Sequence, residues 1–255
     1  MIIDCHTHGG PDYLEWWNRV TKTDKDFISY LDKCGVDKAI VGCGKKGLEA
    51  KTKKDLIEAN EYVFTFCKKH QKIYIPTVNI NPKYQKESIS LLRNYRKQGV
   101  VWVGELCGYV SGYAYDTPEF KELMDVIAEL DMITHFHSGN LIEIEKLVKS
   151  YPKSMFVLPH PGRGRKEIDP RVALAAKYKN LYIDIAGSGS ERIGNIEEMI
   201  DKMGDDRILY GSDFTINEPG GVIARIKNSM IADSSKKKIL GENTLSLLRS
   251  KGALL

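Results

Sequence analysis

Histidines stand in pairs at the ends of two short apolar runs of this sequence. His6 and His8 close the first run, and His135 and His137 close a later one. Side chains two positions apart on a strand point to the same side, so each pair presents two imidazoles together. Imidazole nitrogens that converge in this way are ready ligands for zinc or a similar ion. One such pair is weak evidence, because the spacing also arises by accident.

Three further polar residues strengthen the pattern. Glu105, His160 and Asp213 each follow another apolar run, so that five of the six histidines fall at run ends and only His70 lies on a predicted helix. Burying this many polar groups in one place would be costly if no ion compensated for their lost hydration. The sequence therefore predicts a metal centre assembled from the ends of several strands.

The elements that must position these residues alternate regularly. Helical patterns with charged faces, such as those over 53–69, 84–97, 118–130, 142–149 and 235–249, separate eight apolar runs. Most runs are nearly continuous in their apolar character, as is typical of strands buried on both faces. The predicted strands cover residues 2–6, 37–43, 73–80, 100–106, 132–138, 155–160, 181–186 and 207–213.

This alternation predicts an α/β fold, a (β/α)₈ TIM barrel formed by residues 1–255 as a single domain. Parallel strands need long crossovers, and eight strand–helix units in about 250 residues favour a closed barrel over an open sheet. No linker or low-complexity segment interrupts the series. In such barrels the active site lies at the carboxyl ends of the strands, where the histidines and acids fall.

Composition excludes several other classes of protein. The 38 basic and 34 acidic residues are spread along the chain, which argues against a nucleic-acid surface with its clustered basic stripe. Five scattered cysteines indicate reduced thiols rather than a disulfide framework. We see no signal peptide and no apolar run of the roughly 20 residues that a membrane helix needs. We therefore expect a soluble, cytoplasmic protein that does not bind membranes.

The combined motifs resemble those of the amidohydrolase superfamily of metal-dependent barrel hydrolases, in particular its amidohydrolase-2 branch. The resemblance runs from end to end of the chain. It rests on the segments Ile3-Asp4-Cys5-His6-Thr7-His8, His137-Ser138-Gly139, His160, Gly211-Ser212-Asp213 and Ile239-Leu240-Gly241-Glu242-Asn243. The combination is specific, although no single segment is.

The resemblance implies a role for each matching position. His6, His8, His137 and Asp213 match metal ligands of the family, and His160 matches a histidine that binds a second metal or acts on the substrate. Glu105 stands where some members carry a bridging carboxylate. Other members use a carbamylated lysine on this strand, and this chain has none, which leaves one or two metals open. We expect two, zinc by preference with manganese as the alternative, and we interpret His135 as supporting the ligands from behind.

These roles imply a hydrolase mechanism. The metal would lower the pKa of a bound water towards about 7. Asp213 would accept the proton and return it to the leaving group. The metal and His160 would polarise the oxygen of the bond under attack. The expected reaction is cleavage of an amide, lactone or ester bond.

The loops after the strands should select the substrate. Arg163 follows the sixth strand and is either a ligand for a substrate carboxylate or phosphate or simply a solvated residue. Tyr109 lies in the fourth loop, and Trp17 lies in the first loop with Tyr13 and Trp16, where these aromatic residues either wall a pocket or cover the rim. Together they indicate a small, anionic substrate. The oligomeric state cannot be read from the sequence, although barrels often associate as homodimers.

Several alternatives remain open. Some relatives in the amidohydrolase-2 branch resemble metal-dependent decarboxylases, which use one metal and the strand-six histidine as acid and base. A TatD-type nuclease would share Glu105, but the diffuse charge gives it little support. A polymerase-and-histidinol-phosphatase phosphoesterase would need a histidine two residues after Asp213, where Thr215 stands. A non-catalytic metal-binding barrel would have lost a ligand, and every expected position is filled.

Overall fold

Eight parallel strands form the centre of the computed structural model, which describes residues 1–10 and 20–253. The first three pair in the order β1-β2-β3, and the other five pair in the order β4-β5-β6-β7-β8. Backbone bridges between Thr7 and Phe214 and between Val78 and Val103 join the two sets. The strands therefore close into the predicted barrel. They are β1 (Ile3–Gly9), β2 (Lys38–Cys43), β3 (Tyr74–Pro76), β4 (Trp102–Cys107), β5 (Ile133–His137), β6 (Phe156–Leu158), β7 (Leu181–Asp184) and β8 (Ile208–Leu209).

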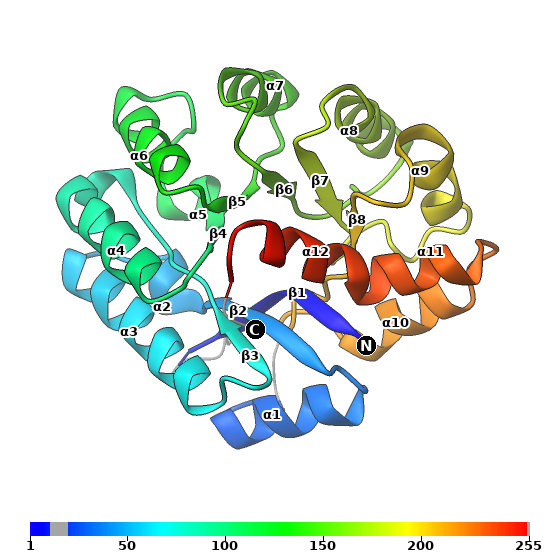
Figure 1. The fold of residues 1–255 in the computed structure, drawn as a ribbon, viewed down its shortest axis with the longest axis horizontal. Coiled ribbons are helices and arrows are strands. Elements are labelled where there is room, and N and C mark those ends of the chain that lie inside the picture. The colour runs from blue at the N-terminus through cyan, green and yellow to red at the C-terminus, as the bar shows by residue number, and fades with distance from the viewer. Residues whose placement is uncertain (11–19, 254–255) are drawn as a thin grey trace.

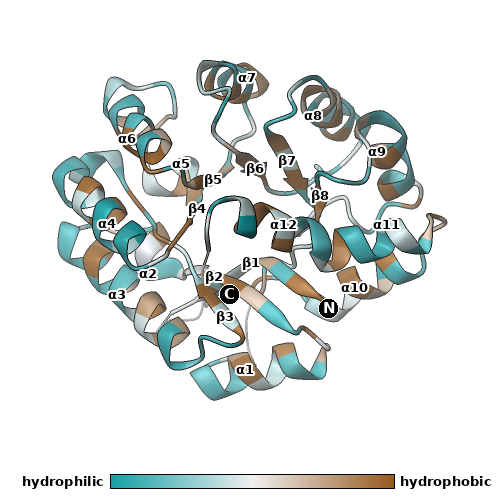
Figure 2. Cartoon of the chain, viewed as in Figure 1, coloured by the Kyte–Doolittle hydropathy of each residue, from teal (hydrophilic) through white to brown (hydrophobic). Residues whose placement is uncertain are grey.

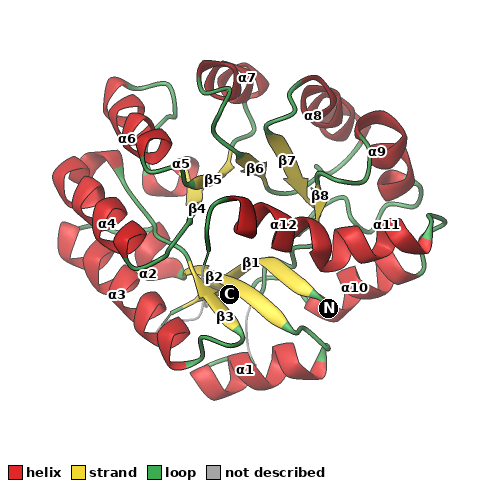
Figure 3. Cartoon of the chain, in the orientation of Figure 1, coloured by secondary structure: helices red, strands yellow, loops and turns green. Residues whose placement is uncertain are grey.

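Helices surround the strands as an outer ring (Figures 1 and 3). The longer ones are α1 (Asp24–Lys33), α3 (Lys53–Lys69), α4 (Gln85–Lys97), α6 (Pro118–Glu129), α7 (Leu141–Ser150), α8 (Arg165–Lys177), α9 (Asn195–Met203), α10 (Pro219–Lys227) and α12 (Asn243–Ser250). Short helical segments are α2 (Lys45–Leu48), the 3₁₀ turn η1 (Pro82–Tyr84), α5 (Gly108–Ser111), α11 (Asp233–Lys237) and the π-helical turn η2 (Lys238–Glu242). No helix in the described part of the chain is long and apolar enough to span a membrane.

The helix boundaries follow local signals in the sequence. Thr52 caps α3 by accepting a hydrogen bond from the backbone of Asp55, whose carboxylate bonds back to the backbone of Thr52. Thr117 caps α6, and Pro118 occupies the first helical position, where its missing N–H costs nothing. These signals explain why both helices begin at the predicted residue.

The last predicted helix, over 235–249, is a composite. It begins at Asp233, continues through the π-helical turn η2 and ends with α12 at Ser250. Leu247 and Leu248 of α12 pack against Trp102 and Leu209 inside the barrel. This apolar cluster fills the barrel near the amino ends of the strands, so only the opposite end is open for a polar site.

Strand β5 shows how the barrel separates its two faces. Ile133 belongs to the cluster inside the barrel and His135 lies edge-on to Trp102, whereas Phe136 packs in the larger core beneath the helices. His137 continues the inward-facing series, as the two-residue period predicts. The helices of the ring likewise carry both apolar and polar residues (Figure 2).

Strands β3, β5, β6, β7 and β8 end earlier than predicted, and the differences at β6 and β8 bear on the site. The strand expected over 207–213 is reduced to Ile208–Leu209, because the N–H of Tyr210 donates to Ile239 of the last helical region instead of to a neighbouring strand. The strand expected over 155–160 stops at Leu158, and His160 adopts a left-handed backbone with φ of 62°. His160 and Asp213 therefore stand on the loops that follow their strands.

Candidate functional site

Four of the predicted residues converge at the open end of the barrel and form what we call the inner cluster: His6, His8, Glu105 and Asp213. The Nε2 atoms of His6 and His8 lie 3.2 Å apart. His6 Nε2 lies 3.4 Å from Glu105 Oε2 and 3.5 Å from Asp213 Oδ1. For His8 Nε2 the corresponding distances are 3.6 and 3.1 Å. All four residues are buried.

These separations fit a single divalent ion. Ligand bonds of 2.0–2.2 Å in tetrahedral geometry place neighbouring donor atoms about 3.3–3.6 Å apart. The five donor–donor distances given above span 3.1 to 3.6 Å. Two imidazoles and two carboxylates are also a donor set that zinc or manganese accepts. The residues present therefore fit the metal that the sequence predicts.

His137 and His160 form a second, more open group, the outer pair. Their rings lie 4.8 Å apart, and their side chains are 25% and 16% exposed, whereas the side chains of His6 and His8 are 1% exposed. Glu105 Oε1 lies 3.1 Å from His137 Nδ1 and 3.8 Å from His160 Nε2. One carboxylate thus faces the inner cluster with one oxygen and the outer pair with the other.

The backbone around these residues is specialised. Among the described non-glycine residues only Asp131, His160 and Asp213 have a positive φ, and two of these three are candidate catalytic residues. Such backbone strain gathers at functional sites. Gly104 has a φ of +101°, and a Cβ there would lie 2.1 Å from the carbonyl oxygen of His135. Glycine at 104 is therefore required where β4 presents Glu105 next to β5.

Burial and neighbouring charges shift the pKa values of the inner cluster. Burial by itself lowers the pKa of His6, but Glu105, Asp184 and Asp213 outweigh it and raise that pKa well above its usual value. Burial favours protonation of Glu105, yet His6 and His137 hold the pKa of its carboxyl well below the usual range. Burial also lowers the pKa of His160. His160 is therefore neutral at pH 7, whereas His6 is cationic in the metal-free protein.

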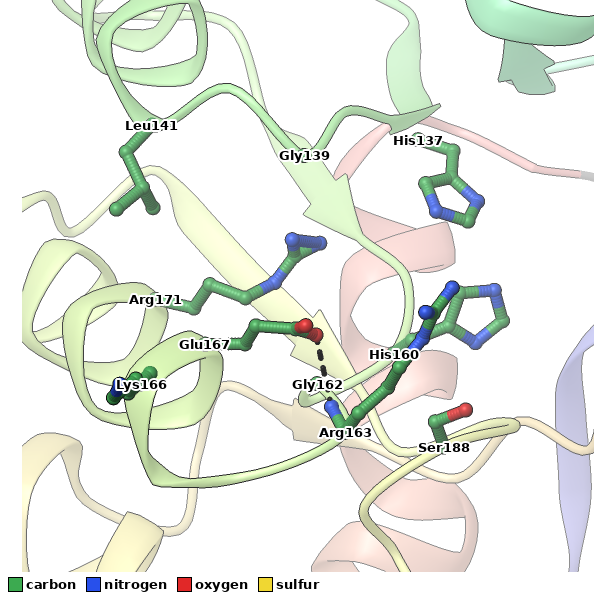
Figure 4. Close-up of a pocket in the computed structure, with 10 residues that line it drawn as sticks. All are labelled: His137, Gly139, Leu141, His160, Gly162, Arg163, Lys166, Glu167, Arg171 and Ser188. Atoms are coloured by element: carbon green, nitrogen blue, oxygen red, sulfur yellow. Dashed lines mark hydrogen bonds between the residues drawn. The ribbon is translucent and has the colours of Figure 1, made fainter.

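The outer pair opens into a cavity of about 380 Å³ that includes Arg163, Lys166 and Arg171 in its wall. Figure 4 shows His137 and His160 on one side and the guanidinium of Arg171 opposite. The only carboxylate in this lining, that of Glu167, accepts a hydrogen bond from the backbone N–H of Arg163 at 2.9 Å. Among the described residues, no acid forms a salt bridge with Arg163, Lys166 or Arg171. The cavity is therefore positively charged and suits an anion.

The remaining predicted residues take different positions. Tyr109 is 70% exposed, and its ring packs edge-on against His137 at 4.9 Å, so it lies beside the outer pair at the barrel mouth. Arg163 lines the cavity. His135 is buried and bonds Asp184 instead of reaching the inner cluster, which agrees with a supporting role. Trp17, with Tyr13 and Trp16, lies outside the described residues.

Sequence reasoning missed two residues that touch the site. Asp184 is completely buried and bonds both His6 and His135. Its signal was available, because it is an acid inside an otherwise apolar strand. Arg171 is buried in α8 and donates to the carbonyl groups of Ser138 and Pro159, next to His137 and His160. A charged residue within a helix gives no comparable signal.

The comparisons with known proteins agree with this arrangement. A family model described as amidohydrolase matches residues 3–249. No curated protein matches the chain. A 2,6-dihydroxybenzoate decarboxylase with 2,6-dihydroxybenzoate bound shares its fold at a TM-score of 0.76 and 15% identity, over 99% of both chains.

Two further solved structures are similar over nearly their whole length. A dihydroxybenzoic acid decarboxylase from Polaromonas sp. JS666, with bound manganese and 2-nitroresorcinol, matches at a TM-score of 0.71 and 14% identity, over 99% of this chain and 98% of that one. A probable 2-pyrone-4,6-dicarboxylic acid hydrolase from Acinetobacter baumannii, with citric acid bound, matches at 0.71 and 16%, over 97% and 99%. At these identities the likeness shows the fold alone.

Proposed function

Because this chain belongs to the amidohydrolase family, in its amidohydrolase-2 branch, we propose that it is a metal-dependent hydrolase. Its expected reaction is cleavage of a C–N or C–O bond, in an amide, lactone or ester, of a small substrate that carries a carboxylate. The family match spans residues 3–249.

The position of Glu105 carries the proposal. Its Oε2 lies 3.4 Å from His6 Nε2, while its Oε1 lies 3.1 Å from His137 Nδ1. A carboxylate with both oxygens engaged in this way suits a bridging role between two divalent ions. Two ions about 3.5–4 Å apart are a common arrangement in hydrolytic sites. The outer pair and Glu105 would hold the second ion.

Asp213 is the expected proton acceptor. A divalent ion in the inner cluster would supply an activated water and a Lewis acid for the bond under attack. Asp213 Oδ1 lies 3.1 Å from His8 Nε2, and its Oδ2 accepts a hydrogen bond from Asn217 at 3.0 Å. The carboxylate is thus fixed beside the inner-cluster nitrogens, where it would accept a proton and later deliver it to the leaving group.

His160 enters the reaction as an acceptor rather than a donor. Its Nδ1 lies 3.0 Å from the carbonyl oxygen of Ala186, which can only accept, so Nδ1 carries the hydrogen. The lowered pKa keeps the ring neutral at pH 7, which leaves a lone pair on Nε2. Nε2 can therefore bind an ion or accept a proton from the substrate. It has no hydrogen to donate, so it is poorly suited to polarising a carbonyl by hydrogen bonding.

The cavity selects the substrate class. Arg163, Lys166 and Arg171 line it, and a planar guanidinium matches a carboxylate in a bidentate manner. The solved relatives named above have names or bound ligands that contain benzoates or polycarboxylic acids. A small carboxylate next to the outer pair is consistent with both observations.

A decarboxylase is the second candidate. In the inner cluster the two histidine nitrogens lie 3.1 to 3.6 Å from each other and from one oxygen of each acid, which is sufficient for one ion. Two of the solved relatives described above are decarboxylases, one with manganese. In this reaction His160 would have to deliver a proton to carbon. Glu105, which turns one oxygen towards each histidine group, favours a two-ion hydrolytic site, so we rank the hydrolase first.

Metal content and product analysis test the proposal together. Zinc and manganese would be counted by elemental mass spectrometry in the wild type and in a His6→Ala/His8→Ala variant. The same proteins would be assayed against carboxylated lactones, amides, esters and hydroxybenzoates. About two ions per chain with hydrolysis products supports the hydrolase. One ion with released CO₂ establishes the decarboxylase, and a wild type that binds no added ion rejects both.

A further inference from the structure

We propose that residues 184–187, which begin at the last residue of β7, form a positioning segment for two histidines of the site. The segment holds His6 and His160 so that the Nε2 atom of each is the free one. This inference rests on the proposed function, because it concerns how the chain prepares its nitrogens for an ion. Neither the sequence motifs nor the family match assigns a role to these residues.

Asp184 fixes His6. Its Oδ2 lies 3.1 Å from His6 Nδ1, and its side chain is completely buried. The same carboxylate also accepts from His135 and from the backbone N–H of Ala186, so it serves His6 as a hydrogen-bond acceptor too. His6 Nδ1 therefore carries a hydrogen, and its Nε2 remains as the nitrogen that faces Glu105 and Asp213.

His135 shares the same oxygen. Its Nε2 lies 2.9 Å from Asp184 Oδ2, while the other oxygen, Oδ1, accepts from the backbone N–H of Ala186 at 2.9 Å. A fourth donor, the backbone N–H of His160, lies 3.5 Å from Oδ1, and together these donors leave the carboxylate a single orientation. His135 thus stabilises Asp184, and Asp184 in turn orients His6, whose ring His135 also contacts edge-on at 4.6 Å.

The next residues fix His160. Its Nδ1 donates to the carbonyl oxygen of Ala186, and its Nε2 faces Glu105 Oε1 at 3.8 Å. Gly187 packs directly against the ring: a Cβ at this position would lie 2.6 Å from His160 Nδ1, and its φ of +57° already disfavours other residues. A side chain at 187 would therefore displace His160.

The two halves of the segment consequently serve different groups. Asp184 bonds the ring of His6 in the inner cluster and touches His160 only through a 3.5 Å bond from its backbone N–H, whereas Ala186 and Gly187 contact the ring of His160 in the outer pair. Carboxylates that bond a ligating histidine from behind typically contribute 10- to 100-fold to metal affinity. A substitution at Asp184 should then mainly change zinc affinity, whereas a substitution at Gly187 should mainly change kcat.

The test compares three full-length variants after metal removal: Asp184→Asn, Gly187→Ala and Asp4→Asn. Asp4 is the matched control, because it is as buried as Asp184 but bonds the backbone N–H groups of His6 and Ser212 and the side chains of Ser212 and Tyr210, and no histidine ring. Zinc affinity would be measured by chelator competition, and kcat would be measured with the substrate that the assays of the proposed function identify. Circular dichroism and thermal unfolding of the metal-free proteins would report on folding.

We expect Asp184→Asn to weaken the tightest zinc site about 10- to 100-fold. Gly187→Ala should leave that site within about threefold and lower kcat at least about tenfold, since general acid–base groups contribute 10²–10⁴-fold. Asp4→Asn should leave zinc affinity within about threefold of the wild-type value, because Asp4 bonds no ring nitrogen of a proposed metal ligand.

Three outcomes would overturn the inference. They are a folded Asp184→Asn protein with unchanged zinc affinity, an equal loss of affinity in Asp4→Asn, or unchanged kcat in Gly187→Ala. If Asp184→Asn does not fold, the contrast between Gly187→Ala and the wild type still decides the part concerning His160. A wild-type protein that binds no zinc would instead refute the proposed function.

Discussion

The inner cluster and the outer pair lie side by side at the barrel mouth, yet they are built differently. His6 and His8 are buried on strand β1, and every ring nitrogen that does not face the cluster donates to Asp184 or to the carbonyl oxygen of Cys43. His137 and His160 are partly exposed and line a cationic cavity. The difference indicates that the buried cluster holds the tighter ion, whereas the open pair meets the substrate and, with Glu105, the second ion.

The strongest test of this division is removal of the proposed proton acceptor. Asp213→Asn keeps the size and an oxygen of the side chain but removes the carboxylate that accepts the proton. We expect kcat to fall about 10²- to 10⁴-fold, the usual contribution of a general base. Steady-state kinetics with metal-saturated protein measures it. A loss below threefold would show that another group accepts the proton.

The outer pair is tested by His160→Gln. If His160 acts on the substrate, kcat should fall about 10²-fold while the tighter metal site keeps its affinity. Glutamine retains hydrogen-bonding capacity close to the imidazole position, which makes the change conservative. Zinc titration alongside kinetics provides the check. Loss of the tighter site in this variant would contradict the separation of the two groups.

The charge of the inner cluster predicts how metal affinity depends on pH. The pKa of His6 is raised well above its usual value, so the metal-free protein carries a proton there at pH 7 that an ion must displace. Affinity should therefore increase with pH by up to about tenfold per unit, until pH reaches the raised pKa. Calorimetry in buffers of different ionisation enthalpy would count the released proton. Binding without proton release would mean that His6 is not displaced.

The smallest expected effect concerns the cavity. Arg163→Gln removes one of three cationic residues in the wall and should raise KM for a carboxylated substrate about three- to tenfold, as expected for a partly solvated ion pair. We expect kcat to stay within twofold, because Arg163 lies outside both histidine groups. An uncharged analogue of the substrate is the control, since its KM should not change.

Much of the site could be predicted because its residues obey local rules. His6 and His8 are two apart on one strand, and Asp213 follows an apolar run, so parallel strands alone place them together. The fold was predictable for the same reason, because apolar runs and amphipathic helical patterns alternate along the sequence. Helix α3 matches its predicted range fully because a capping box marks its start.

What could not be predicted depends on relations between distant elements. The contact of Asp184 with His6 spans 178 positions and depends on the rotation of two strands that are not neighbours. The short length of β8 reflects a bond from Tyr210 to the last helical region, which no local pattern encodes. Arg171 reaches the loops from a helix, where charged residues usually face solvent.

The closure of the barrel between its first and last strands has a consequence for biosynthesis. The hydrogen bond from the Ser212 backbone to Asp4 spans 208 positions, and the inner cluster needs residues from both ends of this interval. At 5–20 residues per second, a ribosome takes about 10 to 40 s to reach Asp213 after His6 has been made. During that time a nascent chain holds two histidines without Asp213. The complete inner cluster therefore forms only after residue 213 has been made.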